Sequence, residues 1–352
     1  MMMNTALYSA VSLSLGLVLS STVHARDIVN LKTQESGVHE VSFQALSDYG
    51  ADVTGEPVAN IALMNQGQAV QIQVTGSDAD PMIFGPGSVI RFIAKPMDTL
   101  YTDTNVYTLS SNASNAQRMG LDNNPIPRGA AAASYLATKR FSPQAEYSFT
   151  SPDRSDPWYA KRIVAVGGPR SEQVSMTLDN VAPGGNSGGT KAKLNVNLWG
   201  SSDLPGATDD HSLAVSFNGQ QVAAKTFDGL ASETLSSELE VVRDGSNTVT
   251  VTLPMDTGYG FDAVNLNSIE LKYPRMFVAQ DNRLDFASTS RSFRVSGFTP
   301  ESMPNGESDV FVVREDEQGV SMMTSTRALC RASCLVTMGC LLYTSPSPRD
   351  RG

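Results

Sequence analysis

A serine in a glycine-rich stretch carries the first pattern that could do chemistry. In Gly185-Asn186-Ser187-Gly188-Gly189 the glycines would let backbone N–H groups face an oxyanion beside the Ser187 hydroxyl. A nucleophilic serine also needs a histidine, and after residue 25 only His39 precedes it in the chain. The next residues, Thr190-Lys191-Ala192-Lys193, do not form the apolar strand that such a motif requires. We therefore favour a flexible turn over a catalytic serine.

An acidic segment offers carboxylate oxygens that could hold calcium. It contains Asp203, Asp209 and Asp210, followed by His211. The Asp-x-Asp-x-Asp-Gly spacing of a calcium loop is missing, so a solvated loop is the favoured alternative. We interpret His211 as a turn or strand-edge residue, and expect no other cofactor.

A pair of aromatic residues gives the candidate ligand loop. Tyr259 and Phe261 lie in the stretch TGYGFD. It follows a string (Gly245, Asn247, Val249, Val251) that resembles the start of a core strand in galactose-binding-type jelly rolls. Sugars bind loop aromatics in such modules, but one pair makes a poor platform, so the favoured alternative is that the rings pack beneath the loop and the domain is a spacer.

All three cysteines lie near the C-terminal end. A metal or redox cluster of Cys330, Cys334 and Cys340 would lack a fourth ligand. The eleven residues CLLYTSPSPRD (340–350) resemble an in-frame translation of a transposase-type sequencing adapter. We therefore interpret residues 321–352 as an artefactual tail and exclude them from the fold. Residues 26–320 contain no cysteine, hence no thiol nucleophile.

The elements that must position these residues are predicted to be strands. Apolar and polar residues alternate with period two, as in antiparallel sheets with one buried face, in the segments 68–76, 193–200, 211–219, 247–254 and 268–274. Asn218-Gly219 predicts a tight hairpin turn. Short helices are expected over Ser42–Tyr49 and Ala130–Lys139. The fold class is all-β, with few short helices.

Turn-rich and Pro-rich stretches divide the chain. A β-rich N-terminal domain is predicted over residues 26–150. A jelly-roll-like β-sandwich follows over 155–273, with Leu198, Trp199 and Phe217 in its core. Residues 274–320 form further strands, beginning at Pro274.

The N-terminal segment is predicted to be a signal peptide. An apolar run from Ala6 to Leu19 precedes the small-x-small site Val23-His24-Ala25, which places cleavage after residue 25. The run is too short to span a bilayer, and we find no later transmembrane segment in the sequence. We expect a protein that is secreted or held at the surface of a bacterial cell. The net charge of −10, with no basic stripe, argues against nucleic acid as a partner.

An ordered set of segments resembles the N-terminal region of gingipain-type secreted cysteine peptidases. The most specific is FGPGSVIRFIAKPMDTLYTDTNVYTL (84–109). GVHEVSFQAL (37–46) is similar to an early family motif, from which His39 and Glu40 depart. Further matches in the same order include residues 57–74, 135–149 and 156–163, and the resemblance covers about residues 28–300.

The resemblance implies a limited role for this chain. In the family these blocks precede a caspase-like domain whose Cys thiolate attacks the peptide carbonyl, with a His partner. That domain would be the missing partner here, and no catalytic residue can be carried over. The chain is thus expected to be a truncated, non-catalytic prosegment and accessory region of a peptidase precursor. The alternative is a stand-alone exported adhesion or carbohydrate-binding β-sandwich that contacts a cell-surface glycan or protein.

Overall fold

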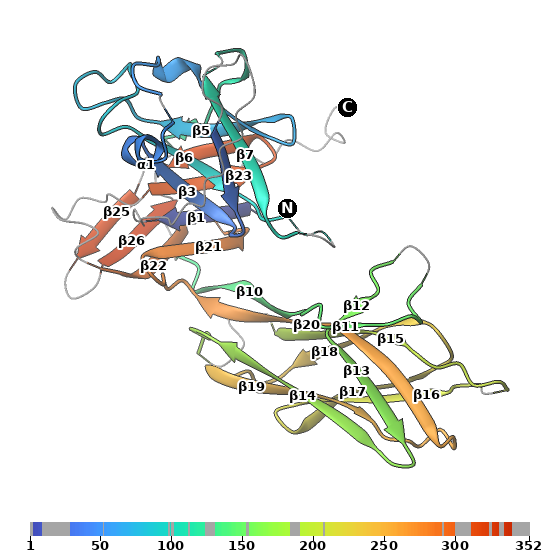
Figure 1. The fold of residues 1–352 in the computed structure, drawn as a ribbon. Coiled ribbons are helices and arrows are strands. Elements are labelled where there is room, and N and C mark those ends of the chain that lie inside the picture. Colours follow the sequence, from blue (N-terminus) through green and yellow to red (C-terminus); the bar gives the residue numbers. More distant parts are fainter. Residues whose placement is uncertain are drawn as a thin grey trace, which may run out of the picture. The chain divides into compact units, whose positions relative to one another are not determined.

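The computed structural model confirms the all-β fold class. It describes residues 3–8, 29–51, 53–97, 99, 102–111, 113–123, 131–152, 155–183, 191–206, 208–290, 292–299, 311–323, 326–330 and 334–339. Within these ranges the helical elements are α1 (Phe43–Asp48), η1 (Val58–Asn60) and η2 (Ala113–Asn115). No helix in the described ranges is long and apolar enough to cross a membrane. The chain forms two compact units, Met1–Ala132 with Val278–Gly352, and Ala133–Phe277 (Figure 1).

The first unit is built around a sheet in which β2, β7, β4, β5, β6 and β3 are successive neighbours, with β8 paired to β5. The bounds of these strands are β2 (Val29–Thr33), β3 (Gly37–Ser42), β4 (Ile61–Asn65), β5 (Gln68–Val74), β6 (Val89–Ala94), β7 (Asn105–Ser111) and β8 (Gln117–Arg118). Every second residue of β3 is buried, because one face of the sheet covers a core that includes Leu46, Phe84 and Phe92.

Two smaller sheets complete the first unit. One has the order β21 (Arg283–Ser288), β1 (Met3–Tyr8), β23 (Phe311–Asp316), β24 (Gly319–Met323) and β9 (Gly120–Asp122). The other has the order β22 (Ser292–Phe298), β26 (Cys334–Gly339) and β25 (Thr326–Cys330). The segment predicted to follow the sandwich therefore returns to the first unit.

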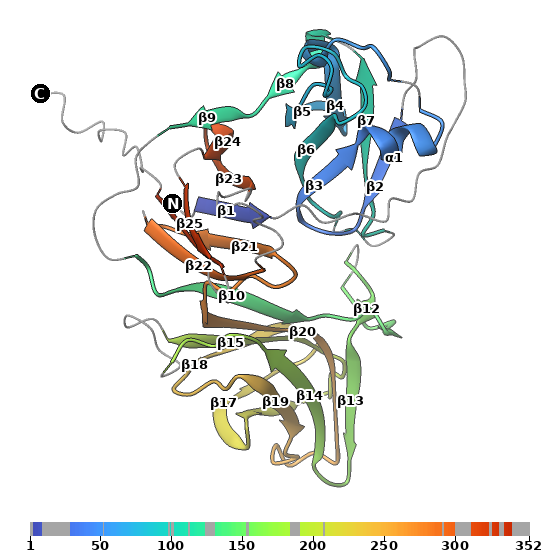
Figure 2. The same ribbon diagram turned by 90° about the vertical axis from the view of Figure 1, so that its left-hand side faces the viewer.

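The second unit is a two-sheet sandwich, which confirms that part of the fold prediction (Figure 2). One sheet contains β10 (Ser134–Phe141), β20 (Phe261–Met276), β15 (Ala192–Gly200) and β18 (Ser232–Leu239) in that order, with β13 (Lys161–Val166) also paired to β20. The other has the order β14 (Arg170–Leu178), β19 (Gly245–Leu253), β16 (His211–Phe217) and β17 (Gln220–Phe227). A short ribbon pairs β11 (Glu146–Tyr147) with β12 (Trp158–Tyr159).

The sandwich core follows the alternation of its strands. Leu198 and Phe217 are buried in it, as the sequence predicts. Trp199, in contrast, is only half-buried and donates from Nε1 to the carbonyl of Thr150 at 2.8 Å. The prediction that Trp199 lies in the core is wrong, because neighbouring residues of a strand face opposite sides of the sheet.

One predicted helix is confirmed and the other is wrong. The helix expected over 42–49 is α1, which Ser42 caps by accepting a hydrogen bond from the Ala45 N–H. The helix expected over 130–139 is instead β10 in its described part, which pairs residue by residue with β20 from Ser134↔Met276 to Phe141↔Ile269. Tertiary pairing overrides the helical composition of this alanine-rich segment.

Two domain boundaries in the structure differ from the predicted ones. Residues 133–150 belong to the second unit, because β10 pairs with β20. β20 continues through Pro274, where a new set of strands was expected, and the Pro274 carbonyl accepts from the Ala182 N–H at 2.9 Å.

The predicted artefactual tail overlaps described strands, since β25 and β26 pair with each other beyond residue 321. The adapter-like residues 340–350 lie outside the described residues, as do Gly185–Gly189 and most of the predicted signal peptide.

Candidate functional site

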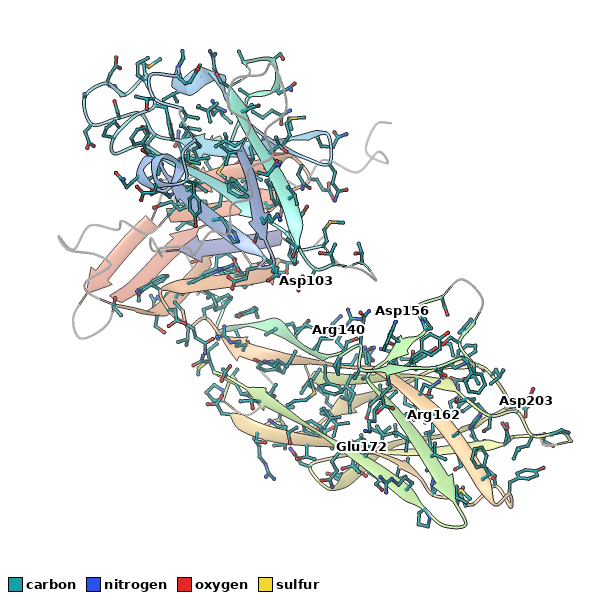
Figure 3. All side chains as sticks on the ribbon, viewed as in Figure 1. Asp103, Arg140, Asp156, Arg162, Glu172 and Asp203 are labelled. Atoms are coloured by element: carbon teal, nitrogen blue, oxygen red, sulfur yellow. The ribbon has the colours of Figure 1, made fainter. Side chains whose placement is uncertain are left out.

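Four connections gather at one end of the second unit. They link β13 to β14, β15 to β16, β17 to β18, and β19 to β20. Strand register places them together, because Val166 pairs with Phe261, Gly200 with Val264, and His211 with Phe227. Figure 3 labels Asp203 on the connection after β15. We call this region the loop end.

A buried histidine holds the loop end together. His211, the first residue of β16, has no exposed surface. Its Nδ1 lies 2.6 Å from Oδ1 of Asp262, and its Nε2 lies 3.2 Å from the Ser202 carbonyl and 3.5 Å from Oδ1 of Asp210. The ring stacks on Phe227 at 4.4 Å between centroids. The interpretation of His211 as a turn or strand-edge residue therefore needs correction: it begins a strand, but its side chain is central.

The surroundings of His211 favour its charged form. Burial alone would lower the pKa of His211. The hydrogen bond and charge of Asp262, the charge of Asp210 and the Ser202 carbonyl act in the opposite direction, and the pKa is raised from its ordinary value. Both ring nitrogens face acceptors, which suits an imidazolium with two donors.

The two carboxylates also fix the backbone of the loops. Asp210 accepts from the N–H of Leu204 at 2.9 Å and from the N–H of Gly229 at 2.8 Å. Asp262 accepts from the N–H of Ser212 at 3.2 Å. The favoured alternative of a solvated loop is thus wrong for Asp210, which is fully buried because its oxygens satisfy these donors.

This cluster contains the residue types of a catalytic triad, but its geometry excludes that use. The Nε2 of His211 faces the carbonyl of Ser202, not its hydroxyl, and His211 and Asp262 are almost fully buried. A substrate carbonyl could not reach a nucleophile here. The cluster therefore positions the loop end.

The other predicted site residues occupy different surroundings. Asp203 and Asp209 are exposed, and Asp209 accepts from the Thr226 hydroxyl at 3.0 Å. Among the described side chains no group of three His, Cys, Asp or Glu residues converges on a metal position. Calcium binding stays a prediction.

The predicted ligand residues Tyr259 and Phe261 lie at the loop end and are half-buried. Phe261 begins β20 directly before the anchored Asp262, and the carbonyl of Gly260 accepts from Gly167 at 3.0 Å. The structure therefore holds Phe261 next to the buried cluster, and Tyr259 lies two residues before it on the same connection.

His39, the histidine considered with Ser187, is buried in β3 of the first unit. Its Nε2 lies 3.2 Å from the Glu35 carbonyl and its ring stacks on Phe92. Burial lowers the pKa of His39. A core role for this neutral ring accounts for these contacts.

Sequence reasoning missed three exposed aromatic residues in the second unit: Tyr147, Phe149 and Trp158. The signal was present in Tyr147-Ser148-Phe149, where a small polar residue separates two aromatic ones. Tyr147 ends β11 and Phe149 lies in the turn that follows, and both are exposed while Ser148 between them is buried.

Comparison with known proteins gives the fold a solved counterpart. No family model matches the sequence, and no curated protein matches it. A crystal structure of dimeric latent PorU from Porphyromonas gingivalis is similar at a TM-score of 0.60 and 14% identity, over 90% of this chain and 30% of that one.

Two further structures match with TM-scores too low to support an argument. An isomalto-dextranase of Arthrobacter globiformis T6, complexed with panose, matches 69% of this chain and 34% of its own at 12% identity and a TM-score of 0.24. The plant receptor-like kinase ANX2 matches 78% of this chain and 88% of its own at 8% identity and a TM-score of 0.26. Of these three structures, latent PorU is the one whose TM-score supports a conclusion. The fold of this chain is similar to that of part of latent PorU, a gingipain-related protein.

Proposed function

We propose that the chain is the non-catalytic N-terminal region of a gingipain-like cysteine peptidase precursor, acting as its prosegment and accessory domain. The similarity to latent PorU supports this most directly, since it covers 90% of this chain but 30% of the solved one. The segments that resemble the family in sequence run through both units. The first unit would be the prosegment and the sandwich the accessory domain.

The residues of the chain fit a non-catalytic role. Residues 26–320 contain no cysteine for a thiolate attack. The His211 cluster is buried and bonded to backbone, which suits rigid presentation of the loop end better than proton transfer. In the precursor these units would shield or position the missing caspase-like domain in the secreted protein or at the cell surface.

Two experiments test this proposal. A long sequencing read through the 3′ end of the gene should show a frame that continues into a domain with a His and a Cys. A stop codon near Val320 would contradict the peptidase proposal. The chain, added to the separately expressed peptidase domain, should inhibit cleavage of a peptide substrate. A continuing frame without inhibition would remove the prosegment role but leave the accessory one.

The alternative proposal is an exported carbohydrate-binding or adhesion protein that uses Tyr259 and Phe261. Their place on a fixed connection of the loop end is its support. A glycan-array signal that disappears in Tyr259→Ala and Phe261→Ala would favour it. A signal that survives both substitutions would exclude this loop as the ligand site.

A further inference from the structure

The most exposed aromatic surface of the second unit lies on and beside the ribbon of β11 and β12. Tyr147, Phe149 and Trp158 have exposed fractions of 62%, 79% and 43%. We call these three residues the aromatic patch. From the size of such side chains they expose roughly 400 Å², which is as large as the functional patches of many monomeric proteins.

Strand pairing explains why Tyr147 and Trp158 face outward together. β11 and β12 pair so that Tyr147 lies opposite Trp158, and their rings meet edge to face at 5.7 Å. The next pair position, Glu146 opposite Tyr159, turns Tyr159 into the protein. Phe149 follows β11 in a turn and is exposed, whereas Ser148 between Tyr147 and Phe149 is buried.

Hydrogen bonds beneath the patch fix this segment to the sandwich. The buried Ser148 hydroxyl accepts from Nδ2 of Asn265 at 2.9 Å and lies 2.9 Å from the Thr150 hydroxyl. The Thr150 hydroxyl lies 2.9 Å from that of Ser201, and its carbonyl accepts from Trp199. The exposed rings therefore stand on an ordered base, which reduces the entropy lost when a ligand binds.

Polar side chains border the patch at Asp156. Asp156 accepts from Nε2 of Gln144 at 2.8 Å and from the Trp158 N–H at 2.9 Å (Figure 3). Glu146 belongs to the pair position on the other face of the ribbon, where it accepts from the Arg162 N–H at 2.8 Å and lies 3.0 Å from Nζ of Lys161. The edge of the patch thus offers an amide and a carboxylate, which can form hydrogen bonds with hydroxyl groups and would repel an anionic ligand.

We propose that the aromatic patch binds a neutral oligosaccharide. The C–H faces of pyranose rings pack on exposed aromatic rings, and their hydroxyls find donors and acceptors such as Gln144 and Asp156 at the edge of the patch. A protein partner fits less well, because a stable interface buries about 800 Å² on each side, twice the area of the patch. This inference does not rest on the peptidase proposal.

The patch is distinct from the predicted ligand loop. Trp158 precedes Val166, the neighbour of Phe261, by eight residues that run mostly as extended chain. That length of strand spans roughly 25 Å. The Ser148 hydroxyl beneath the patch contacts Asn265, four residues from Phe261, and a hexasaccharide can span this separation. Substitutions at each place therefore decide which of them carries the binding.

Tryptophan fluorescence gives a direct test, because the chain has two tryptophans, Trp158 in the patch and Trp199 beneath it. The full chain is titrated with cello-, malto-, xylo- and mannohexaose. At least one should change the emission saturably in wild type and in Trp199→Phe, but not in Trp158→Phe. Tyr147→Ala with Phe149→Ala should weaken binding, measured by calorimetry, at least about tenfold.

The matched control is Tyr259→Ala with Phe261→Ala, which should bind the hexasaccharide with unchanged affinity. Circular dichroism and thermal melting verify that each variant keeps its fold. The proposal is overturned if none of the four sugars binds up to about 10 mM. It is also overturned if binding depends on Tyr259 and Phe261, or if patch variants change dimerisation or peptidase inhibition but not sugar binding.

Discussion

At the residue scale, the imidazole of His211 shows how a buried charge can be structural. It lies between Asp262 and Asp210, and each carboxylate also accepts hydrogen bonds from backbone N–H groups. An isolated charge at this depth would be strongly destabilising, so every member of the cluster depends on the others. The geometry of the loop end therefore depends on the side chains of Asp210, His211 and Asp262.

Gly200 is required for this cluster to close. A Cβ at this position would lie 2.2 Å from the Gly229 carbonyl oxygen and 2.7 Å from Nε2 of His211. Because the backbone oxygen cannot move aside freely, Gly200→Ala should lower the free energy of unfolding by about 1–3 kcal/mol. Denaturant unfolding measures this effect. Gly168→Ala is the control, since nothing lies within 4 Å of its added Cβ, and an equal loss in both variants would refute the argument.

At the element scale, the tight hairpin between β16 and β17 depends on backbone conformation. Asn218 and Gly219 have φ values of 50° and 84° between β16 and β17, as the sequence predicts for this turn. Gly219→Ala should lower the free energy of unfolding by about 1–2 kcal/mol, because a side chain is strained in the left-handed region. Gly260→Ala, at a position with ordinary φ and open space, should be close to neutral. A stability of Gly219→Ala equal to that of the control would contradict this reasoning.

The strands could be predicted because their alternation is a local property of the sequence. The sandwich strands and the turn at Asn218 follow from it directly. β10 was predicted as a helix because its partner, β20, is more than a hundred residues away and its own composition favours helix. The Asp210–His211–Asp262 cluster was missed for a similar reason, since Asp262 lies 51 residues from His211. Contacts between residues so far apart in the sequence form only when the chain folds.

At the scale of the whole molecule, the second unit begins and ends at neighbouring positions. Its first and last strands pair, and Ser134 lies opposite Met276. Paired Cα atoms are about 5 Å apart, so a short glycine linker can replace residues 134–276. We expect the shortened chain to retain the first unit, with a cooperative thermal transition by circular dichroism. Loss of that transition would show that the first unit depends on the second.

The two units should respond to pH in opposite directions. Burial lowers the pKa of His39 in the first unit, so its stabilising effect is present above about pH 6.5 and is lost as the pH falls through its folded-state pKa. The pKa of His211 in the second unit is raised, so its effect is present below about pH 6.5 and is lost as the pH rises through its folded-state pKa.

Calorimetry of the full chain between about pH 5 and 8 should therefore show one Tm that rises with pH and one that falls. The shortened chain identifies the transition of the first unit. His39→Gln should flatten only the rising Tm, and His211→Asn only the falling one. Two transitions that shift in the same direction, with slopes unchanged by either substitution, would show that the buried histidines do not control the pH response. Opposite slopes would mean that a change of pH stabilises one unit and destabilises the other.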